Sequence, residues 1–249
     1  MPGKSIIEFN QVSFSYNGNN VLKNVNAVIN DKDFIWIVGP NGGGKTTLVK
    51  LMLGLLRPDH GEINILGENP VKARQKIGYM PQAVHLDPLF PATVLDIALM
   101  GRLRGNRVPG LYNRADRLAA QKALAEVGLE NRAKDSFASL SGGQQRKLLI
   151  ARALAGEPEI LILDEPTANL DLKAEKELNE VLVKFTGQLT IVLVSHDPAF
   201  VSKSVKKVLC VNRTVAEHPT SEVDANFLGH FFGGDLRMVR HDKHLGNQQ

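Results

Sequence analysis

The sequence has little cysteine and no long apolar segment. Cys210 is the only cysteine among the 249 residues, so no disulfide can form within the chain, and a reducing compartment is expected. The most apolar stretches, at 34–38, 160–163 and 191–194, are four or five residues long, whereas a membrane-spanning helix needs about 20. The start, MPGKSIIEFN, lacks the apolar core of a signal peptide. We therefore expect that the chain neither crosses a membrane nor is exported through a cleaved signal.

Charge of one sign is also scarce. Lys and Arg number 30 against 26 Asp and Glu, which gives a formal net charge of +4. Because binding to a nucleic-acid backbone needs clustered basic residues, this excess does not indicate such a partner, and we expect no nucleic acid. The composition, 43% hydrophobic, 6% aromatic and 22% charged, excludes a disordered or fibrous chain. The length suits one domain with an inserted subdomain.

Strand and helix patterns alternate at both ends of the chain. Val12, Phe14 and Tyr16 alternate with serines, which is typical of a half-buried strand, and the continuous apolar run 34–38 is typical of a strand covered on both faces. Further strands are predicted at 62–66, 77–80, 159–163, 190–194 and 205–211, and helices at 46–56, at 172–185 and from Asp197 onward. This alternation predicts an α/β fold with a mainly parallel sheet.

The middle of the chain, about 93–156, has helical patterning instead. Asn113 begins one apolar period, which ends at Gly128. Ser141 begins another, with Gln144 three residues later, the pattern of a reciprocal helix cap. The segment from Asn113 to Asp116 has the outline of the guanine-recognition motif N-K-x-D, but its helical setting indicates a cap. We therefore predict a helical insert of about 50 residues between two α/β stretches.

A glycine-rich turn follows the apolar strand 34–38. Gly39-Pro-Asn-Gly-Gly-Gly-Lys45-Thr46 matches the phosphate-binding pattern G-x-x-x-x-G-K-[ST] and lies between a predicted strand and helix, as that motif requires. Glycines let backbone N–H groups approach a phosphate closely, and the helix N-terminus adds positive potential. Lys45 is expected to reach the β- and γ-phosphates, and the Thr46 hydroxyl is expected to bind Mg²⁺. The alternative, a flexible turn with a surface lysine, does not explain the flanking strand and helix.

A second acidic motif ends the predicted strand 159–163. Asp164 and Glu165 lie at the carboxyl edge of the sheet, where ligands of open α/β sheets bind. Asp164 suits Mg²⁺ binding through water, and Glu165 suits a base that polarises the attacking water. The alternative for Glu165 is a surface acid beside a helix. These two motifs predict a nucleoside triphosphatase without distinguishing its class.

The segment Leu140-Ser-Gly-Gly-Gln-Gln-Arg146, ahead of the acidic motif, indicates the class. With the other motifs, it resembles the signature of the ATP-binding cassette (ABC) family, the nucleotide-binding subunits of membrane transporters. The resemblance extends over about residues 5–215 and includes five short motifs in the family's order. It implies a P-loop NTPase core with a mainly parallel sheet, an antiparallel β part near the N-terminus and an inserted α-helical subdomain. In this interpretation one domain comprises a core at 1–92 and 157–215, a helical signature subdomain at about 93–156 and a tail at 216–249.

The resemblance assigns roles to further residues. Tyr16 resembles the aromatic side chain that stacks on adenine, although a tyrosine inside a strand core is the alternative. Gln82 resembles the glutamine that contacts Mg²⁺ and water and communicates with the membrane partner, and His196 resembles the switch histidine at the γ-phosphate. Asn169-Leu-Asp171 resembles the loop after the acidic motif that crosses the dimer, although the family more often has Ser or Gly where this chain has Asn169. The expected nucleotide contacts are Tyr16, Gly39, Pro40, Asn41, Gly42, Gly43, Gly44, Lys45, Thr46, Thr47, Ser141, Gly142, Gly143, Gln144 and Asp171; Glu165, His196, Lys45 and Gln82 are expected in catalysis, and Thr46, Gln82 and Asp164 around Mg²⁺.

The family's scheme implies partners. The signature faces the γ-phosphate held by a second copy, so two ATP molecules are expected between two head-to-tail chains, a homodimer. Integral membrane permease subunits and a substrate-binding protein are further expected partners, and the chain is expected at the cytoplasmic face of the membrane. Phe90, in an irregular apolar segment after Gln82, is expected either to dock the permease or to pack in the core.

The phrase GPNGGGKTTL and the region around 208–213 resemble bacterial zinc and manganese transporter cassettes. This implies import of a divalent metal ion. Motors for a siderophore or cobalamin importer, motors of exporters, and non-transport clamps acting in DNA repair or on ribosomes are the alternatives. Four histidines, His218, His230, His241 and His244, lie toward the C-terminus without a fixed zinc spacing, so that segment is either a solvated polar tail or a metal sensor.

Overall fold

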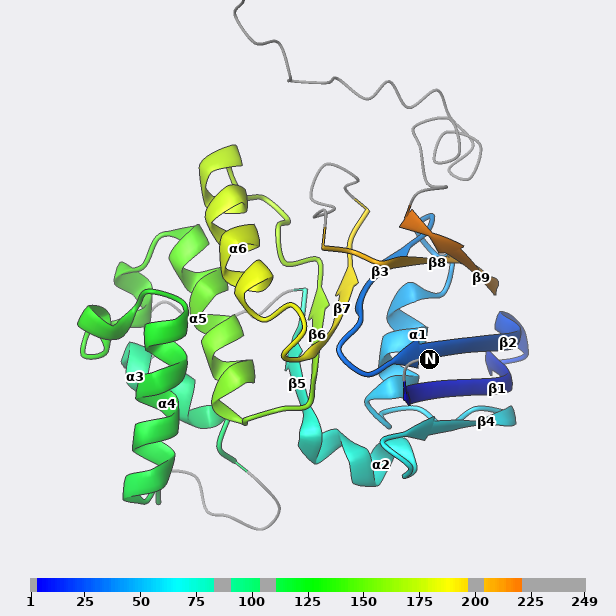
Figure 1. The fold of residues 1–249 in the computed structure, drawn as a ribbon, viewed down its shortest axis with the longest axis horizontal. Helices are drawn as coiled ribbons and strands as arrows, with labels where there is room; N and C mark the ends of the chain where they lie inside the picture. Colours follow the sequence, from blue (N-terminus) through cyan, green and yellow to red (C-terminus); the bar gives the residue numbers. More distant parts are fainter. Residues whose placement is uncertain (1–3, 83–90, 104–110, 197–203, 221–249) are drawn as a thin grey trace, which may run out of the picture.

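A computed structural model describes residues 4–82, 91–103, 111–196 and 204–220. Two sheets and two groups of helices form the fold (Figure 1). The helices α3 to α6 cover one face of a six-stranded sheet, and α1 with a three-stranded sheet covers the other. The expected Phe90 docking segment and the helix expected after Asp197 lie outside the described residues, as do three of the C-terminal histidines, His230, His241 and His244.

The smaller sheet is antiparallel, with the order β2-β1-β4. Its strands are β1 (Ser5–Tyr16), β2 (Asn19–Asn30) and β4 (His60–Ile65). The larger sheet has the order β5-β6-β7-β3-β8-β9, and all its neighbouring strands are parallel except β8 and β9. Its strands are β3 (Phe34–Val38), β5 (Ile77–Met80), β6 (Ile160–Asp164), β7 (Thr190–Val194), β8 (Lys207–Asn212) and β9 (Thr214–Pro219). The predicted mainly parallel sheet and N-terminal antiparallel part are therefore confirmed.

Helices connect these strands. They are α1 (Lys45–Met52), α2 (Pro70–Ala73), α3 (Val94–Met100), α4 (Arg114–Glu126), α5 (Gly142–Ala155) and α6 (Leu172–Lys184), with short 3₁₀ turns at Arg74–Lys76, Glu130–Arg132 and Phe137–Ser139. The predicted caps are present, because the side chains of Asn113 and Ser141 each accept a hydrogen bond from the backbone N–H three residues later. Since α3, α4 and α5 all lie between β5 and β6 in the chain, the middle of the sequence is helical as expected.

The continuous apolar runs follow from burial on both faces of the larger sheet. In β3, Phe34, Trp36 and Val38 belong to the core under the helices, whereas Ile35 and Ile37 belong to the core under the smaller sheet. Successive side chains of a strand point to opposite faces, so a sheet with two cores needs apolar residues at every position. This accounts for the uninterrupted run that the sequence shows.

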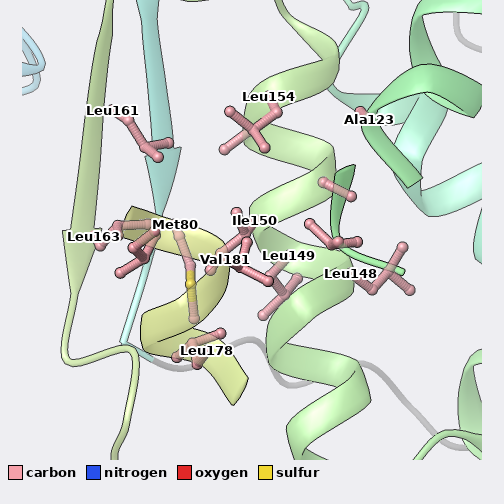
Figure 2. Packing of buried hydrophobic residues seen from close by; sticks show 14 of the residues in the cluster. Met80, Ala123, Leu148, Leu149, Ile150, Leu154, Leu161, Leu163, Leu178 and Val181 are labelled. Carbon is pink, nitrogen blue, oxygen red and sulfur yellow. The ribbon is translucent and has the colours of Figure 1, made fainter. Parts of the chain in front are cut away.

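The helical core is built mainly on α5. Figure 2 shows Ile150 and Leu149 of α5 facing Met80 of β5, Leu163 of β6 and Val181 of α6. All five side chains are at most 5% exposed. The apolar face of α5 therefore fixes the position of its own N-terminus, which carries the signature residues, relative to the carboxyl ends of β5 and β6.

Two details differ from the sequence expectation. The helix predicted at 46–56 ends at Met52, because Gly54 adopts a left-handed conformation with φ of 64°, and Leu55 is 60% exposed instead of lying on the buried face. Residues 214–219 form β9, which pairs with β8, so His218 belongs to a sheet edge.

Candidate active site

The glycine-rich loop lies between β3 and α1 and is held by the end of β8. The N–H of Arg213 donates to the carbonyl of Gly43 at 2.9 Å. At Gly39, a Cβ atom would lie 2.0 Å from the carbonyl oxygen of Val211, so only glycine allows this approach. Gly44 is the residue before α1 and has φ of 107°, which an L-side chain rarely adopts. The loop therefore holds backbone N–H groups in a fixed arrangement at the N-terminus of α1.

Lys45, the first residue of α1, is turned back onto this loop. Its Nζ donates to the carbonyl oxygens of Gly39 at 2.7 Å and Pro40 at 3.0 Å. Burial lowers the pKa of Lys45, and the nearby carboxylates of Glu165 and Asp164 oppose that shift. The ammonium group thus lies within the loop and faces the two carboxylates of the second motif.

Asp164 ends β6, next to β5. The hydroxyl of Tyr79 on β5 lies 3.4 Å from Oδ2 of Asp164, so the two meet at the carboxyl edge of the sheet. Burial raises the pKa of Asp164, with a further contribution from the charge of Glu165. Burial and the neighbouring Asp164 raise the pKa of Tyr79 to about 12, so the phenol keeps its proton and serves as a donor.

Glu165 follows Asp164 with a left-handed backbone, φ of 49°, an unfavourable conformation for a side chain with a Cβ. Its N–H donates to the carbonyl of Val194 at the end of β7, at 2.8 Å. Nδ1 of His196 lies 2.9 Å from Oε2 of Glu165. The buried Trp36 indole fixes the same corner, because it donates to the carbonyl of Ser195 at 3.0 Å. The left-handed backbone of Glu165 is therefore held by its own hydrogen bond to β7, and its carboxylate is held by His196.

These elements surround a cavity of about 330 Å³. Its lining comprises Tyr16, Val21, Asn41, Gly42, Gly44, Lys45, Thr46, Thr47, Gln82, Asp164 and Glu165. Tyr16 is 41% exposed and packs edge-on against Phe14, with ring centroids 4.8 Å apart, so it is not buried in the strand core. One open aromatic face, a glycine loop, a lysine and two carboxylates therefore share a single cavity.

The signature residues and Asp171 lie apart from this cavity. The side chain of Ser141 caps α5, and that of Asp171 caps α6 by accepting from the N–H of Ala174 at 2.7 Å. A Cβ on Gly143 would lie 2.9 Å from Cβ of Ala174, so the starts of α5 and α6 adjoin each other. None of Ser141, Gly142, Gly143, Gln144 and Asp171 is among the described residues that line the glycine-loop cavity.

A larger cavity, of about 450 Å³, lies between β5 and the C-terminal halves of α3 and α5. Tyr79, Met100 and Arg152 are among its lining residues, and no described residue of that lining carries a carboxylate. Volume alone would select this cavity, but the glycine loop and the two acids line the smaller one. The chemistry therefore places the candidate site at the glycine loop.

The sequence does not predict three supporting contacts at this site. Tyr79 meets Asp164, Val211 closes over Gly39, and Arg146 of α5 donates to backbone carbonyls on two separate loops. Of these three contacts, only the one made by Tyr79 has a local signal in the sequence, namely a tyrosine on a short strand three residues before Gln82. The other two contacts depend on how distant segments pack.

Known proteins resemble this chain over most of its length. Residues 22–168 match the family model described as "ABC transporter". A probable metal transport system ATP-binding protein of Chlamydia pneumoniae is 42% identical over 80% of this chain and 82% of that protein. The zinc import ATP-binding protein ZnuC of Pseudomonas fluorescens is 37% identical over 86% of this chain and 77% of that protein.

Solved structures also resemble this chain in fold. A chain of a transporter described as of the metal-chelate type, in an inward-facing conformation, superposes with a TM-score of 0.80 at 32% identity over 92% of this chain and 89% of that one. A bacterial ABC transporter cassette in a dimeric structure gives 0.70 at 30% identity, over 86% of this chain and 98% of that one. Among the described residues, no helix combines the length and apolarity needed to span a bilayer.

Proposed function

We propose that this chain, which belongs to the ABC transporter family and is an ATP-hydrolysing subunit, drives the import of a divalent metal ion, zinc or manganese. The observation that carries the proposal is the single cavity in which Lys45, Asp164 and Glu165 meet beside the glycine loop, in a chain whose relatives carry metal-transport names. Each residue's role follows from its place around that cavity.

ATP would lie with its adenine on Tyr16 and its phosphates in the loop. The exposed face of Tyr16 supports stacking, and the backbone N–H groups of 42–46 support phosphate binding at the start of α1. Lys45 would exchange its contacts to Gly39 and Pro40 for the β- and γ-phosphates, which offer it a full negative charge.

The residues around the phosphates suit Mg²⁺. Thr46, Gln82 and Asp164 line the same cavity and offer a hydroxyl, an amide and a carboxylate oxygen. Mg²⁺ prefers oxygen ligands and is typically held by one or two carboxylates together with substrate phosphates. The ion would neutralise phosphate charge, while Tyr79 keeps the Asp164 carboxylate in place through its hydroxyl.

Glu165 is positioned to polarise the attacking water. The contact between its Oε2 and His196 orients the carboxylate that lines the cavity, and the hydrogen bond from its own N–H to Val194 fixes the backbone. His196 would then meet the γ-phosphate, and Gln82, which lines the cavity, would help to orient the water.

Two chains would complete the site. The N-terminus of α5, with Ser141 and Gly143, does not contribute to the described lining of its own chain's cavity, so a second copy arranged head to tail is the natural donor of these groups. The dimeric structure of a cassette that superposes on this chain supports pairing of two chains. Closure on ATP and opening after hydrolysis would move permease subunits at the cytoplasmic face of the membrane, and a substrate-binding protein would deliver the metal.

Measurement of metal uptake in cells lacking this chain tests the proposed cargo. We expect uptake of zinc or manganese, measured by elemental mass spectrometry in chelated medium, to fall and to be restored by the wild-type chain but not by Glu165→Gln. Unchanged metal uptake with a loss of siderophore-bound iron or cobalamin uptake would refute the metal proposal while leaving the ATPase assignment intact.

A further inference from the structure

Arg146 joins two loops of the active site to helix α5. Its Nη1 donates to the carbonyl of Gln82 at 2.8 Å, and its Nη2 donates to the carbonyl of Ala168 at 3.3 Å. These acceptors are 64 and 22 residues away along the chain. The guanidinium group of Arg146 therefore contacts both the loop after β5 and the turn after β6. Arg146 itself belongs to α5, which begins at Gly142.

Both acceptors adjoin the reacting groups. Gln82 lines the cavity itself. Ala168 belongs to the turn that begins at Glu165, because its N–H points to the carbonyl of Glu165 at 3.3 Å, and this turn leads to Asp171 at the start of α6. Arg146 therefore links the two loops to each other and to α5 through hydrogen bonds.

Burial at this position disfavours the charged form of Arg146, but the planar shape of its guanidinium group suits the two carbonyl acceptors. Burial lowers the pKa of Arg146, and no carboxylate of the described residues lies within ion-pair distance of it. A planar guanidinium group has several donors in a fixed fork and can hold two carbonyl oxygens at once, whereas an ammonium group is a single point charge. Nζ of the next residue, Lys147, lies 2.6 Å from Oε2 of Glu177, and this ion pair links α5 to α6.

We propose that Arg146 is a positioning residue for hydrolysis, which holds the Gln82 loop and the 165–171 turn in register with the phosphate-binding end of α5. This inference rests on the proposed roles of Gln82 and Glu165 in hydrolysis, and it does not depend on which cargo is transported. Arg146 is not among the described residues that line the cavity, so we expect its loss to act through the geometry of the groups that do.

The test compares Arg146→Gln, Arg146→Lys and the matched control Arg152→Gln in the full-length chain. Arg152 lies on the same helix and burial lowers its pKa as well, but among the described residues it donates no hydrogen bond to either loop. Steady-state ATP hydrolysis separates kcat from KM, and hydrogen–deuterium exchange followed by mass spectrometry reports on the peptides that contain 79–82 and 165–171.

We expect Arg146→Gln to lower kcat about tenfold with KM for ATP changed less than about twofold, because displacement of catalytic groups impairs the chemical step more than binding. Amide exchange should become faster in both peptides. Arg146→Lys should recover part of kcat, since an ammonium group keeps N–H donors but lacks the planar fork that holds both carbonyls in a fixed geometry. Arg152→Gln should stay within about twofold of the wild type in kcat.

The proposal is overturned if Arg146→Gln raises KM with kcat unchanged, if it matches Arg152→Gln in kcat, or if exchange changes in neither peptide. If Arg146→Gln does not fold, the lysine variant decides through the same kcat and exchange comparison. A wild-type chain that hydrolyses ATP but supports no metal uptake would refute the proposed cargo, and the Arg146 comparison would still stand.

Discussion

Replacement of Gly39 by alanine would place a methyl carbon 2.0 Å from the carbonyl oxygen of Val211. Carbon and oxygen atoms normally approach to about 3.3 Å, so β3 and β8 must separate locally by roughly 1.3 Å. Both clashing groups belong to the backbone, and no side-chain rotation can relieve the contact. Overpacking of this kind costs about 3 kcal/mol, at the upper end of the usual range.

Two other glycines supply matched controls. Gly42 has φ of 76°, but no atom of the described residues would lie within 4 Å of an added Cβ, so Gly42→Ala meets only the backbone penalty, about 1 kcal/mol. Gly142, at the start of α5, has neither a positive φ nor a described neighbour within 4 Å, so Gly142→Ala should leave stability unchanged or slightly raised. Gly39→Ala thus measures the steric clash, Gly42→Ala measures backbone strain alone, and Gly142→Ala measures the effect of adding a methyl group where neither is present.

Urea unfolding measures these differences through Trp36, the single tryptophan, which is buried in the strand that leads into the glycine loop. With a slope of about 2 kcal/mol per molar, the midpoint should fall by about 1.5 M for Gly39→Ala and about 0.5 M for Gly42→Ala. Nucleotide affinity should fall more than about tenfold for Gly39→Ala, because a displacement of roughly 1 Å misplaces the phosphate donors. Equal midpoints for the two variants would refute the steric argument.

Three further outcomes are expected. Glu165→Gln with ATP should form a stable dimer of twice the 27.3 kDa chain mass in light scattering, because the nucleotide is held without hydrolysis; a persistent monomer would contradict the two-chain scheme. Asp164→Asn should raise the melting temperature near pH 7.5 and lose this gain near about pH 4. Burial raises the pKa of Asp164 in the folded chain, so the carboxylate costs the folded chain stability as the pH rises above the ordinary pKa of an aspartate in the unfolded chain. A gain equal at both pH values would contradict the assignment. Cys210 should react with a thiol reagent far more slowly in the native chain than in urea, because burial raises its pKa to about 11 and roughly one thiol in a thousand is ionised at pH 8; equal rates would show that the thiol is accessible.

Much of the fold is predictable because its signals are local. The run 34–38, the glycine loop and the start of α1 are contiguous, so the strand–loop–helix unit is visible without knowledge of the rest of the chain. The caps at Asn113 and Ser141 span three residues each, and their side chains make the predicted hydrogen bonds. Lys45, Thr46 and Asp164 then share a cavity because parallel strands bring their carboxyl ends to one edge.

The end of α1 shows the limit of periodicity. Leu55 continues the apolar spacing of Leu48, Leu51 and Met52, yet the helix ends before it, because Gly54 takes a left-handed conformation. A glycine within an apolar period is compatible with either continuation or termination of a helix. The local sequence does not choose, and a Cβ at Gly54 would lie 2.8 Å from the N atom of Val71, so the packing of α2 helps decide.

The glycine loop, the acidic pair and the helical insert are all encoded locally, because each depends on residues close together in the chain. Three other contacts exist only once the chain is folded: Val211 closes over Gly39, Tyr79 meets Asp164, and Arg146 holds Gln82 and Ala168. The partners in these contacts are 22 to 172 residues apart in the numbering, and whether they meet depends on strand order, register and the packing of α5 on the sheet. Those quantities are set by the burial of two whole cores and are not encoded in any short segment.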